Sequence, residues 1–173
     1  KVNIDLGGAD GAGDTVVLNA TNADDAITIT NNNGVVTVSG LGADVTISNF
    51  DSSDRIVING LGGDDVIQAS GLTGMQFTAN GGDGGDVLVG SRANDILSGG
   101  AGDDVLIGNG GIDVLDGGPG DNVVLNSAVG APNVALLGQF MASSFVTAGD
   151  GHGGSPITDA PSSQPPLLAA PHA

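Results

Sequence analysis

Short runs of aliphatic and β-branched residues alternate with turns rich in Gly, Asp and Asn along most of the chain. The pattern is most regular between residues 81 and 125, where five nonapeptides follow without a gap: GGDGGDVLV, GSRANDILS, GGAGDDVLI, GNGGIDVLD and GGPGDNVVL. Such runs, bounded by Gly, Asn and Asp, are typical of strands between turns. The pattern therefore predicts one short strand per repeat.

Two positions of the repeat keep a similar residue in every copy. The sixth positions are Asp86, Asp95, Asp104, Asp113 and Asn122, and the eighth positions are Leu88, Leu97, Leu106, Leu115 and Val124. A further copy, GLGGDDVIQ, begins at Gly60 and carries Asp65 and Ile67. It lies 21 residues before Gly81, which is two repeats plus three inserted residues.

Regular short strands without intervening helical segments predict a solenoid. Two repeats would form one coil of two turns and two strands, and successive coils would stack as parallel strands about 4.8 Å apart. The fold class predicted is all-β: a right-handed parallel β-roll or β-helix solenoid with a short C-terminal cap. The eighth-position residues would point inward as a thin ladder. A plain β-helix in which Asp only caps turns is the alternative, both for residues 81–125 and for residues 1–59.

Changes in the pattern suggest four segments. Residues 1–59 are expected to form irregular coils, because Asp or Asn precedes β-branched runs at a looser spacing of about ten residues. Residues 60–126 form the regular β-roll, and residues 127–147 form a cap. Within the cap, Leu137, Phe140, Met141 and Phe145 predict a short helix or strand. Residues 148–173 are rich in Gly, Ser and Pro and are expected to be a flexible tail.

Composition argues against a thick hydrophobic core. The chain has 32 Gly, four Phe and neither Trp nor Tyr, and its formal net charge is −17. All 20 acidic residues are Asp, a short side chain that favours turns and reaches nearby backbone or metal. Such a net negative charge repels itself, and bound divalent cations would relieve this repulsion. Nucleic acid is excluded as a partner for want of a basic patch, and the absence of Cys excludes disulfides and thiolate sites. No apolar run approaches the length for membrane insertion.

The tandem pattern G-G-x-G-x-D-x-U-x resembles that of the RTX, or haemolysin-type, calcium-binding repeat family. The resemblance covers residues 81–125 and the copy at residues 60–68. It implies several Ca²⁺ ions, each lying between one loop and the loop 18 residues later. Calcium takes six to eight oxygen ligands, and glycine lets the backbone aim its carbonyl groups into a loop. Because each site needs two stacked coils, binding and folding would be one event.

The family geometry assigns three sites to the regular array, with Asp side chains bridging neighbouring ions. The expected ligands are Gly82, Gly84, Asp86, Gly99, Ala101 and Asp104 in the first site; Ser91, Ala93, Asp95, Gly108, Gly110 and Asp113 in the second; and Gly100, Gly102, Asp104, Gly117, Pro119 and Asn122 in the third. Arg92 and the neutral Asn122 are expected to weaken the second and third sites. Gly63 and Asp65 would pair with Gly81, Asp83 and Asp86 in a further site, which the three-residue insertion puts in doubt.

The resemblance also implies a function. It predicts a secreted, extracellular or cell-surface protein of bacterial type, exported unfolded by type I secretion and folded by calcium outside the cell. No enzyme is expected. Two competing binding motifs are also missing, because an EF-hand needs Glu and a phosphate loop needs G-K-[ST], and the chain contains neither. One alternative is a self-associating subunit of a surface layer, adhesin or filament. Another is an accessory module that binds polysaccharide.

Overall fold

The fold is known from a computed structural model of the chain. It describes residues 1–8, 10–128, 131–135, 145–147 and 157–159, and every helix or strand element among them is a strand. Two compact units, Lys1–Gln139 and Phe140–Ala173, make up the chain. The described residues thus confirm the predicted all-β class and contain no helix that could span a membrane.

Two sheets form the first unit, and the second unit contains a hairpin. The nine-stranded sheet contains, in spatial order, β1 (Val2–Asp5), β5 (Val45–Ser48), β4 (Val35–Ser39), β3 (Ala26–Asn32), β7 (Val66–Gly71), β9 (Val87–Val89), β11 (Val105–Ile107), β13 (Val123–Ala128) and β14 (Ala131–Ala135). The five-stranded sheet contains β12 (Val114–Asp116), β10 (Asp95–Ala101), β8 (Gln76–Asp83), β6 (Arg55–Gly62) and β2 (Thr15–Asn19). In the second unit, β15 (Phe145–Thr147) pairs antiparallel with β16 (Ile157–Asp159).

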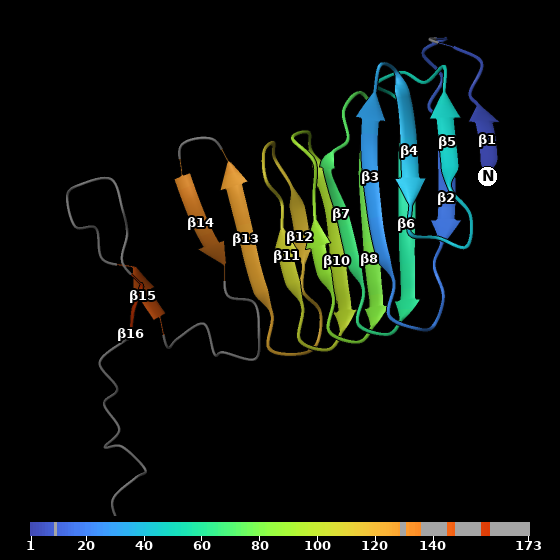
Figure 1. Ribbon diagram of the computed structural model, residues 1–173. Coiled ribbons are helices and arrows are strands. Elements are labelled where there is room, and N and C mark those ends of the chain that lie inside the picture. The colour runs from blue at the N-terminus through green and yellow to red at the C-terminus, as the bar shows by residue number, and fades with distance from the viewer. Residues whose placement is uncertain (9, 129–130, 136–144, 148–156, 160–173) are drawn as a thin grey trace, which may run out of the picture. The chain divides into compact units, whose positions relative to one another are not determined.

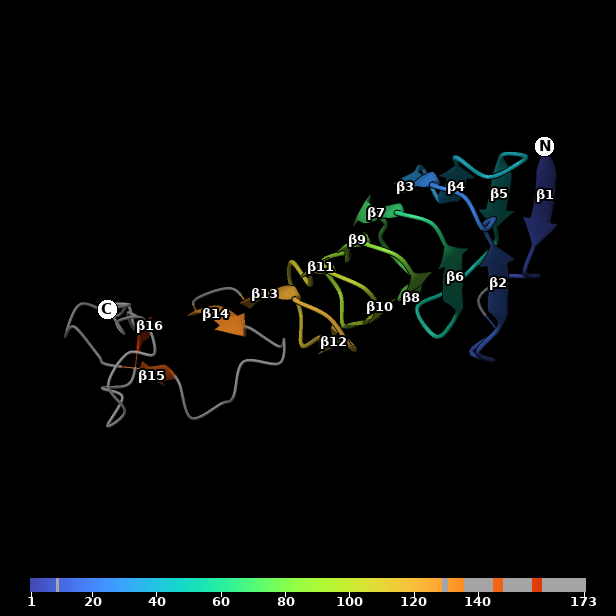
Figure 2. The same ribbon diagram turned by 90° about the horizontal axis from the view of Figure 1, so that it is seen from below.

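From β6 to β13 the chain passes alternately between the two sheets, as Figures 1 and 2 show. The strands of each sheet stack in parallel, so that Leu88 pairs with Leu106 and Leu106 with Val124. These eighth-position side chains are buried, as is that of Leu97 in the opposite sheet. The predicted coil of two strands and the inward ladder are both confirmed.

The N-terminal coils depart from simple parallel stacking. Strands β3, β4 and β5 form an antiparallel meander inside the nine-stranded sheet. Asn33 (φ 53°) and Gly34 (φ 79°) form the two-residue turn between β3 and β4, and positive φ at both positions is the requirement of a type I′ hairpin. The Asn-Gly pair reverses the chain, so within residues 1–59, for which irregular coils were expected, β3 to β5 do not stack as parallel strands.

The strand β14 lies within the predicted cap and pairs antiparallel with β13. Val134 and Ala135 belong to β14, and Phe145 and Val146 belong to β15, so both described ends of the segment expected to be helix or strand are strand. Leu137, Phe140 and Met141 lie outside the described residues. So does most of the predicted flexible tail, apart from β16.

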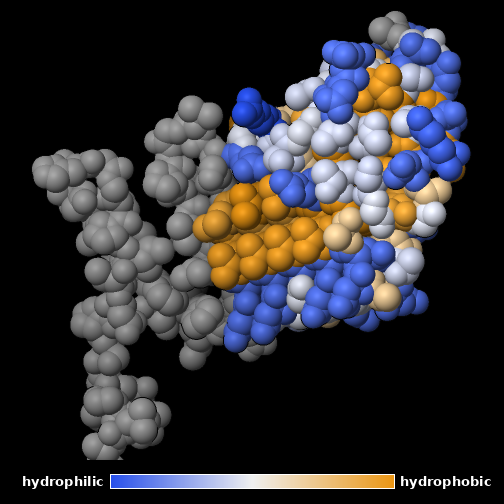
Figure 3. All heavy atoms as spheres, viewed as in Figure 1, coloured by the Kyte–Doolittle hydropathy of each residue, from blue (hydrophilic) through white to orange (hydrophobic). Residues whose placement is uncertain are grey.

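An apolar band covers the outer face of the nine-stranded sheet over β7, β9, β11 and β13 (Figure 3). The seventh and ninth positions of the repeat supply it, since they flank the buried eighth position on each strand. Its members are Val66, Val87, Val89, Val105, Ile107, Val123 and Leu125. The sixth-position aspartates lie instead in or beside the turns that join the sheets.

Candidate metal centre

The turns that join the two sheets lie along two edges of the solenoid. The first edge, leading from the five-stranded to the nine-stranded sheet, consists of loops 20–25, 60–65, 81–86, 99–104 and 117–122. The second edge, leading back, consists of loops 51–54, 72–75, 90–95 and 108–113. The expected ligands of the first and third sites therefore lie on the first edge, and those of the second site lie on the second edge.

A ladder of buried polar side chains runs along the first edge. The backbone N–H of Asp65 donates to Oδ1 of Asp86 (2.8 Å), that of Asp86 to Oδ1 of Asp104 (2.8 Å), and that of Asp104 to Oδ1 of Asn122 (2.7 Å). The N–H of Asp25 donates to Oδ1 of Asp65 in the same way (2.8 Å). One oxygen of each sixth-position side chain thus fastens its coil to the preceding one.

The second carboxylate oxygen is left without a partner at four sixth positions. Oδ2 of Asp65, Asp86, Asp104 and Asp113 is buried and accepts no hydrogen bond. Burial raises the pKa of all four carboxyl groups, because it removes water from the charged form. A buried charge without a partner is strongly unfavourable, and a bound cation is the usual remedy.

Backbone carbonyl groups approach the same oxygens in the first predicted site. A Cβ on Gly81 would lie closer than 3.0 Å to both Oδ2 of Asp86 and the carbonyl oxygen of Gly99, so only glycine leaves this space open. The N–H of Gly84 donates to the carbonyl of Ala101 (2.8 Å), which joins two further predicted ligands across the same pair of coils. The structure therefore brings the predicted ligands of the first site together.

Backbone carbonyl oxygens would have to supply many of the ligands in any metal site. Among the described residues, no three His, Cys, Asp or Glu side chains gather into a metal-binding group. Carboxylate and carbonyl oxygens are the hard ligands that calcium prefers, whereas zinc favours nitrogen and sulfur. The donor set of the loops therefore fits calcium.

The second edge differs because Ser91 satisfies the carboxylate of Asp95. The Ser91 N–H donates to Oδ2 of Asp95 (2.6 Å) and its hydroxyl donates to Oδ1 (2.9 Å). Burial raises the pKa of Asp95 to about 6, although the bonds from Ser91 act in the opposite direction. Oδ1 of Asp113 accepts the N–H of Asp95 (3.0 Å), and Arg92 is exposed. Only Asp113 has an unpartnered oxygen in the second predicted site.

Asn122 closes the ladder at its C-terminal end. Its Oδ1 accepts the N–H of Asp104, as an aspartate would, but its Nδ2 donates to the carbonyl of Gly118 (2.9 Å) and of Gly120 (3.5 Å). These are the second and fourth positions of the loop, whose carbonyl groups are the expected ligands in other repeats. The neutral amide of Asn122 thus donates hydrogen bonds to carbonyl groups that, in the other repeats, are expected to bind the cation.

The upstream loops are satisfied by the chain itself. Oδ2 of Asp25 accepts both the N–H (2.8 Å) and the hydroxyl (2.7 Å) of Thr21. Oδ2 of Asp54 accepts the N–H of Asp51 (2.7 Å), and its Oδ1 accepts that of Asp14 (2.9 Å). Sequence reasoning missed the hydroxyl donors. A Ser or Thr four residues before the sixth-position Asp, as at both Thr21 and Ser91, was the available signal.

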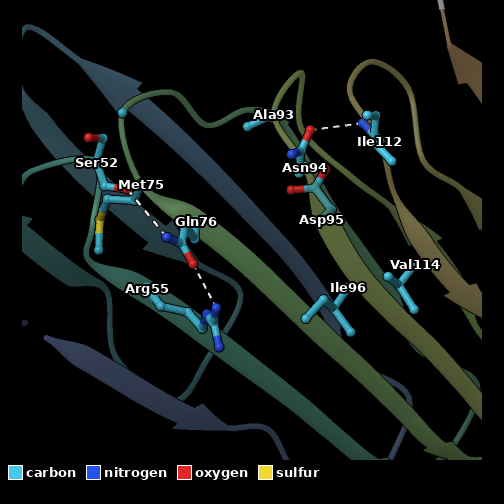
Figure 4. A pocket seen from close by; sticks show the side chains of 11 residues that line it. Ser52, Arg55, Met75, Gln76, Ala93, Asn94, Asp95, Ile96, Ile112 and Val114 are labelled. Carbon is cyan, nitrogen blue, oxygen red and sulfur yellow. Dashed lines mark hydrogen bonds between the residues drawn. The ribbon is translucent and has the colours of Figure 1, made fainter. Parts of the chain in front are cut away.

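A hollow of about 680 Å³ lies on the outer face of the five-stranded sheet beside the second edge (Figure 4). Nη2 of Arg55 donates to Oε1 of Gln76 (2.6 Å) there, and Ile96, Ile112 and Val114 are exposed around it. Asp95 is its single acidic lining residue. The hollow is separate from the ladder of the first edge.

Comparison with known protein families found one match. The profile described as the RTX calcium-binding nonapeptide repeat (4 copies) matches residues 80–115 and 99–125. No curated protein and no solved structure matches the chain. The matched residues include all the loops from 81–86 to 117–122, whereas loop 60–65 lies outside them.

Proposed function

The array at residues 80–125 belongs to the RTX calcium-binding nonapeptide repeats, and from this premise we propose that the protein binds Ca²⁺ ions between stacked coils. The observation that carries the proposal is the pair of buried, unpartnered Oδ2 atoms of Asp86 and Asp104. The three sites predicted from the sequence are the proposed positions, together with the further site of Gly63, Asp65, Gly81, Asp83 and Asp86. We place the strongest on the first edge between loops 81–86 and 99–104. In the second site Ser91 already donates to the Asp95 carboxylate, and in the third the neutral Asn122 stands where an aspartate would supply charge.

Calcium binding would be coupled to folding of the array. Apart from its loops, the array is held by a single buried aliphatic residue on most strands, such as Leu88, Leu97 and Leu106. Each ion contacts two coils, so the site exists only once the coils have stacked. A ligand that binds only the folded state stabilises it, by about 2.7 kcal/mol at 100 times its dissociation constant.

The proposed biological role follows the family resemblance. The chain would leave a bacterial cell unfolded, through type I secretion, because cytosolic calcium is too low to fill the sites. Extracellular calcium modules bind at roughly 10⁻⁴–10⁻³ M. The array would then fold at the cell surface or in the medium.

Far-ultraviolet circular dichroism during a Ca²⁺ titration tests the proposal, with Mg²⁺ as the control ion. We expect a cooperative gain of β signal with Ca²⁺ alone, reversed by a chelator. Asp86→Asn should shift the transition to higher calcium, whereas Asp44→Asn, which removes the same charge at an exposed site, should leave it in place. A β spectrum unchanged by exhaustive chelation would refute the coupling of folding to calcium.

A structural subunit is the second candidate, and the apolar band over β7, β9, β11 and β13 favours it. Two such bands would bury their valine rows against each other as packed sheets do. Calcium would assist by neutralising the flanking loops. Sedimentation with and without Ca²⁺ separates the two candidates, because a calcium-loaded monomer at all concentrations would exclude self-association.

A further inference from the structure

We propose that the hollow on the outer face of the five-stranded sheet binds a small organic anion, a carboxylate that carries a short aliphatic chain. Figure 4 shows the hollow from close by: strands β6, β8, β10 and β12 cross its floor, and loops of the second edge lie around it. Its volume of about 680 Å³ lies within the usual range of ligand pockets, roughly 300–1,000 Å³. This site is additional to the calcium sites and takes a ligand of the opposite charge.

A three-residue insertion on the second edge forms one wall of the hollow. Gln68 pairs with Val89 and Phe77 pairs with Asp95, so the step from Gln68 to Phe77 is nine residues, whereas the step from Val89 to Asp95 is six. The extra residues lengthen the turn that contains loop 72–75, and part of this loop lines the hollow. A longer turn beside regular ones breaks the even surface of the solenoid, and the hollow lies at this break.

Arg55 supplies the positive charge of the hollow, as the single basic residue that lines it. Its Nη2 donates to Oε1 of Gln76 (2.6 Å), and Nε2 of Gln76 donates to the carbonyl oxygen of Ser52 (3.5 Å), so the amide is held with its oxygen toward the guanidinium. The bond to Gln76 uses one of the five N–H groups of the guanidinium, and the buried Nε has no acceptor among the described residues. The guanidinium is therefore held in place with donors to spare for an anion.

Three exposed aliphatic side chains line the same hollow. Ile96, Ile112 and Val114 are 41%, 81% and 61% exposed. Ile112 stands at the fifth position of its repeat, where the other loops of the array carry Gly, Asn or Asp. Its N–H donates to Oδ1 of Asn94 (2.8 Å), which fixes its backbone beside the hollow. Because burial of aliphatic surface is favourable, these side chains favour a ligand with an apolar part.

The aspartates next to the hollow already have donors of their own. Asp95 is buried and both its oxygens accept hydrogen bonds from Ser91, and Asp54, which precedes Arg55, is buried and accepts a backbone N–H at each oxygen. The net charge of −17 on the chain opposes binding of an anion that carries more than one charge. A singly charged carboxylate matches the one guanidinium and can accept two parallel N–H bonds from it. These features favour a carboxylate over a phosphate.

Titration of the full chain with hexanoate tests the inference, followed by ¹H–¹⁵N NMR in excess CaCl₂. We expect saturable shifts of the backbone amides of Gln76, Ile96, Ile112 and Val114 and of the Nε–H signal of Arg55. Acetate has the same charge but no chain to bury, and should bind about tenfold or more weakly. 1-Hexanol keeps the chain but not the charge, and should bind weakly by a similar factor, because the hydrogen bonds to a charged group are lost.

Two arginine variants remove the same charge at different places. Arg55→Gln removes it from the hollow and should weaken hexanoate binding by about tenfold or more. Arg92→Gln removes it from an exposed side chain outside the lining and should change the binding by less than about twofold, since salt screens exposed charges. Ile112→Ser should weaken binding several-fold, whereas Val17→Ser, at an exposed position of the same sheet, should leave it unchanged.

Equal hexanoate binding by the two arginine variants, or amide shifts that do not saturate, would overturn the inference. If Arg55→Gln fails to fold, a crystal structure of the unsubstituted protein with 6-bromohexanoate decides the matter. An anomalous bromine peak beside Ile112 and Val114, with the carboxylate on Arg55, supports the site. Absence of bromine from the hollow refutes it.

Discussion

The N-terminal coils (residues 1–79) and the repeat array (residues 81–125) belong to the same solenoid but are stabilised by different means. All the buried hydrophobic residues of the described solenoid except Leu88, Leu97, Leu106 and Val124 precede Gly81. In the N-terminal coils, hydroxyl and N–H donors satisfy Oδ2 of Asp25 and Asp54, although Oδ2 of Asp65 has no partner, whereas three of the four sixth-position aspartates of the array keep an unpartnered oxygen. The comparison teaches that the N-terminal coils are stabilised mainly by apolar burial, whereas the array combines a thin apolar row with buried carboxylates that lack a donor.

Calcium removal should separate the two regions most sharply. We expect amide hydrogen exchange in β9 and β11 to accelerate by roughly 100-fold or more on chelation, since binding stabilises the folded array by mass action. Amides of β4 and β5 should change little, because hydrophobic burial holds them. Equal acceleration in both regions would show that the N-terminal coils also depend on the metal.

Removing a core side chain should destabilise the N-terminal coils whether or not calcium is bound, but should destabilise the array only when calcium is present. Phe77→Ala creates a cavity in the N-terminal coils and is expected to lower the free energy of unfolding by about 3–5 kcal/mol, with or without calcium. Leu106→Ala, its counterpart in the array, should lower it by about 2–5 kcal/mol only when calcium is present. Urea unfolding followed by circular dichroism measures both. A calcium-dependent effect of Phe77→Ala would contradict the view that the N-terminal coils are stable without calcium and the array is not.

Asp104→Asn tests the polar ladder without disturbing the backbone. The amide keeps an oxygen that can accept the Asp86 N–H, as Asn122 does for Asp104, but it loses the charge that would face the ion. Since a hydrogen bond or contact to a charged group is worth about 1.5–3 kcal/mol, the calcium midpoint of folding should rise by roughly tenfold or more. An unshifted midpoint in the calcium titration would remove Asp104 from the ligand set.

The pH dependence should reverse its sign with calcium. Burial raises the pKa of Asp86, Asp104 and Asp113, and that of Asp95 to about 6, so without metal the folded array binds protons more tightly than the unfolded chain. This stabilisation is complete below the ordinary carboxyl pKa of about 3.9 and is lost as the pH rises through the raised values. Calcium-free protein should therefore show more β signal at pH 5 than at pH 7. In excess Ca²⁺ the β signal should instead be higher at pH 7 than at pH 5, because protons compete with the ion for the carboxylates. A higher signal at pH 5 under both conditions would argue against protons and Ca²⁺ binding to the same carboxylates.

The smallest effect is expected at Ser91. Ser91→Ala removes the hydroxyl donor from Asp95 and should weaken the calcium-free loop by about 1 kcal/mol while allowing calcium to bind the second edge a few-fold more tightly. Thr21→Ala removes the equivalent hydroxyl in the N-terminal coils and is the control. A titration of both variants gives the comparison, and weaker calcium binding in Ser91→Ala would mean that the hydroxyl assists the ion.

The repeat itself predicted most of the fold. A Gly-rich turn, an aspartate and a β-branched run every nine residues specify a turn followed by a strand, and this local information was enough for the two-strand coil and the inward row from Leu88 to Val124. The same reasoning failed at Asn33 and Gly34, where a local turn signal reverses the chain. An Asn-Gly pair between two β-branched runs specifies a two-residue hairpin, and this local signal overrides the coil pattern.

By itself, the sequence determined the residue types that face the loops: carboxylates and glycines at fixed spacing, and therefore a preference for a hard cation. Only the tertiary structure decided that Asp65, Asp86 and Asp104 are buried and which coil donates to their first carboxylate oxygen. Asp25, Asp95 and Asp65 occupy the same position of similar loops, yet Thr21 and Ser91 satisfy the first two while the third keeps a free oxygen. The tertiary structure also placed the three-residue insertion on the edge away from Asp65. The physical reason is that turns, and the Ser or Thr donors within them, are specified by neighbours in the chain. Burial of the aspartates and the hydrogen bonds to their Oδ1 atoms come instead from coils that lie 18 to 40 residues apart and meet only after stacking.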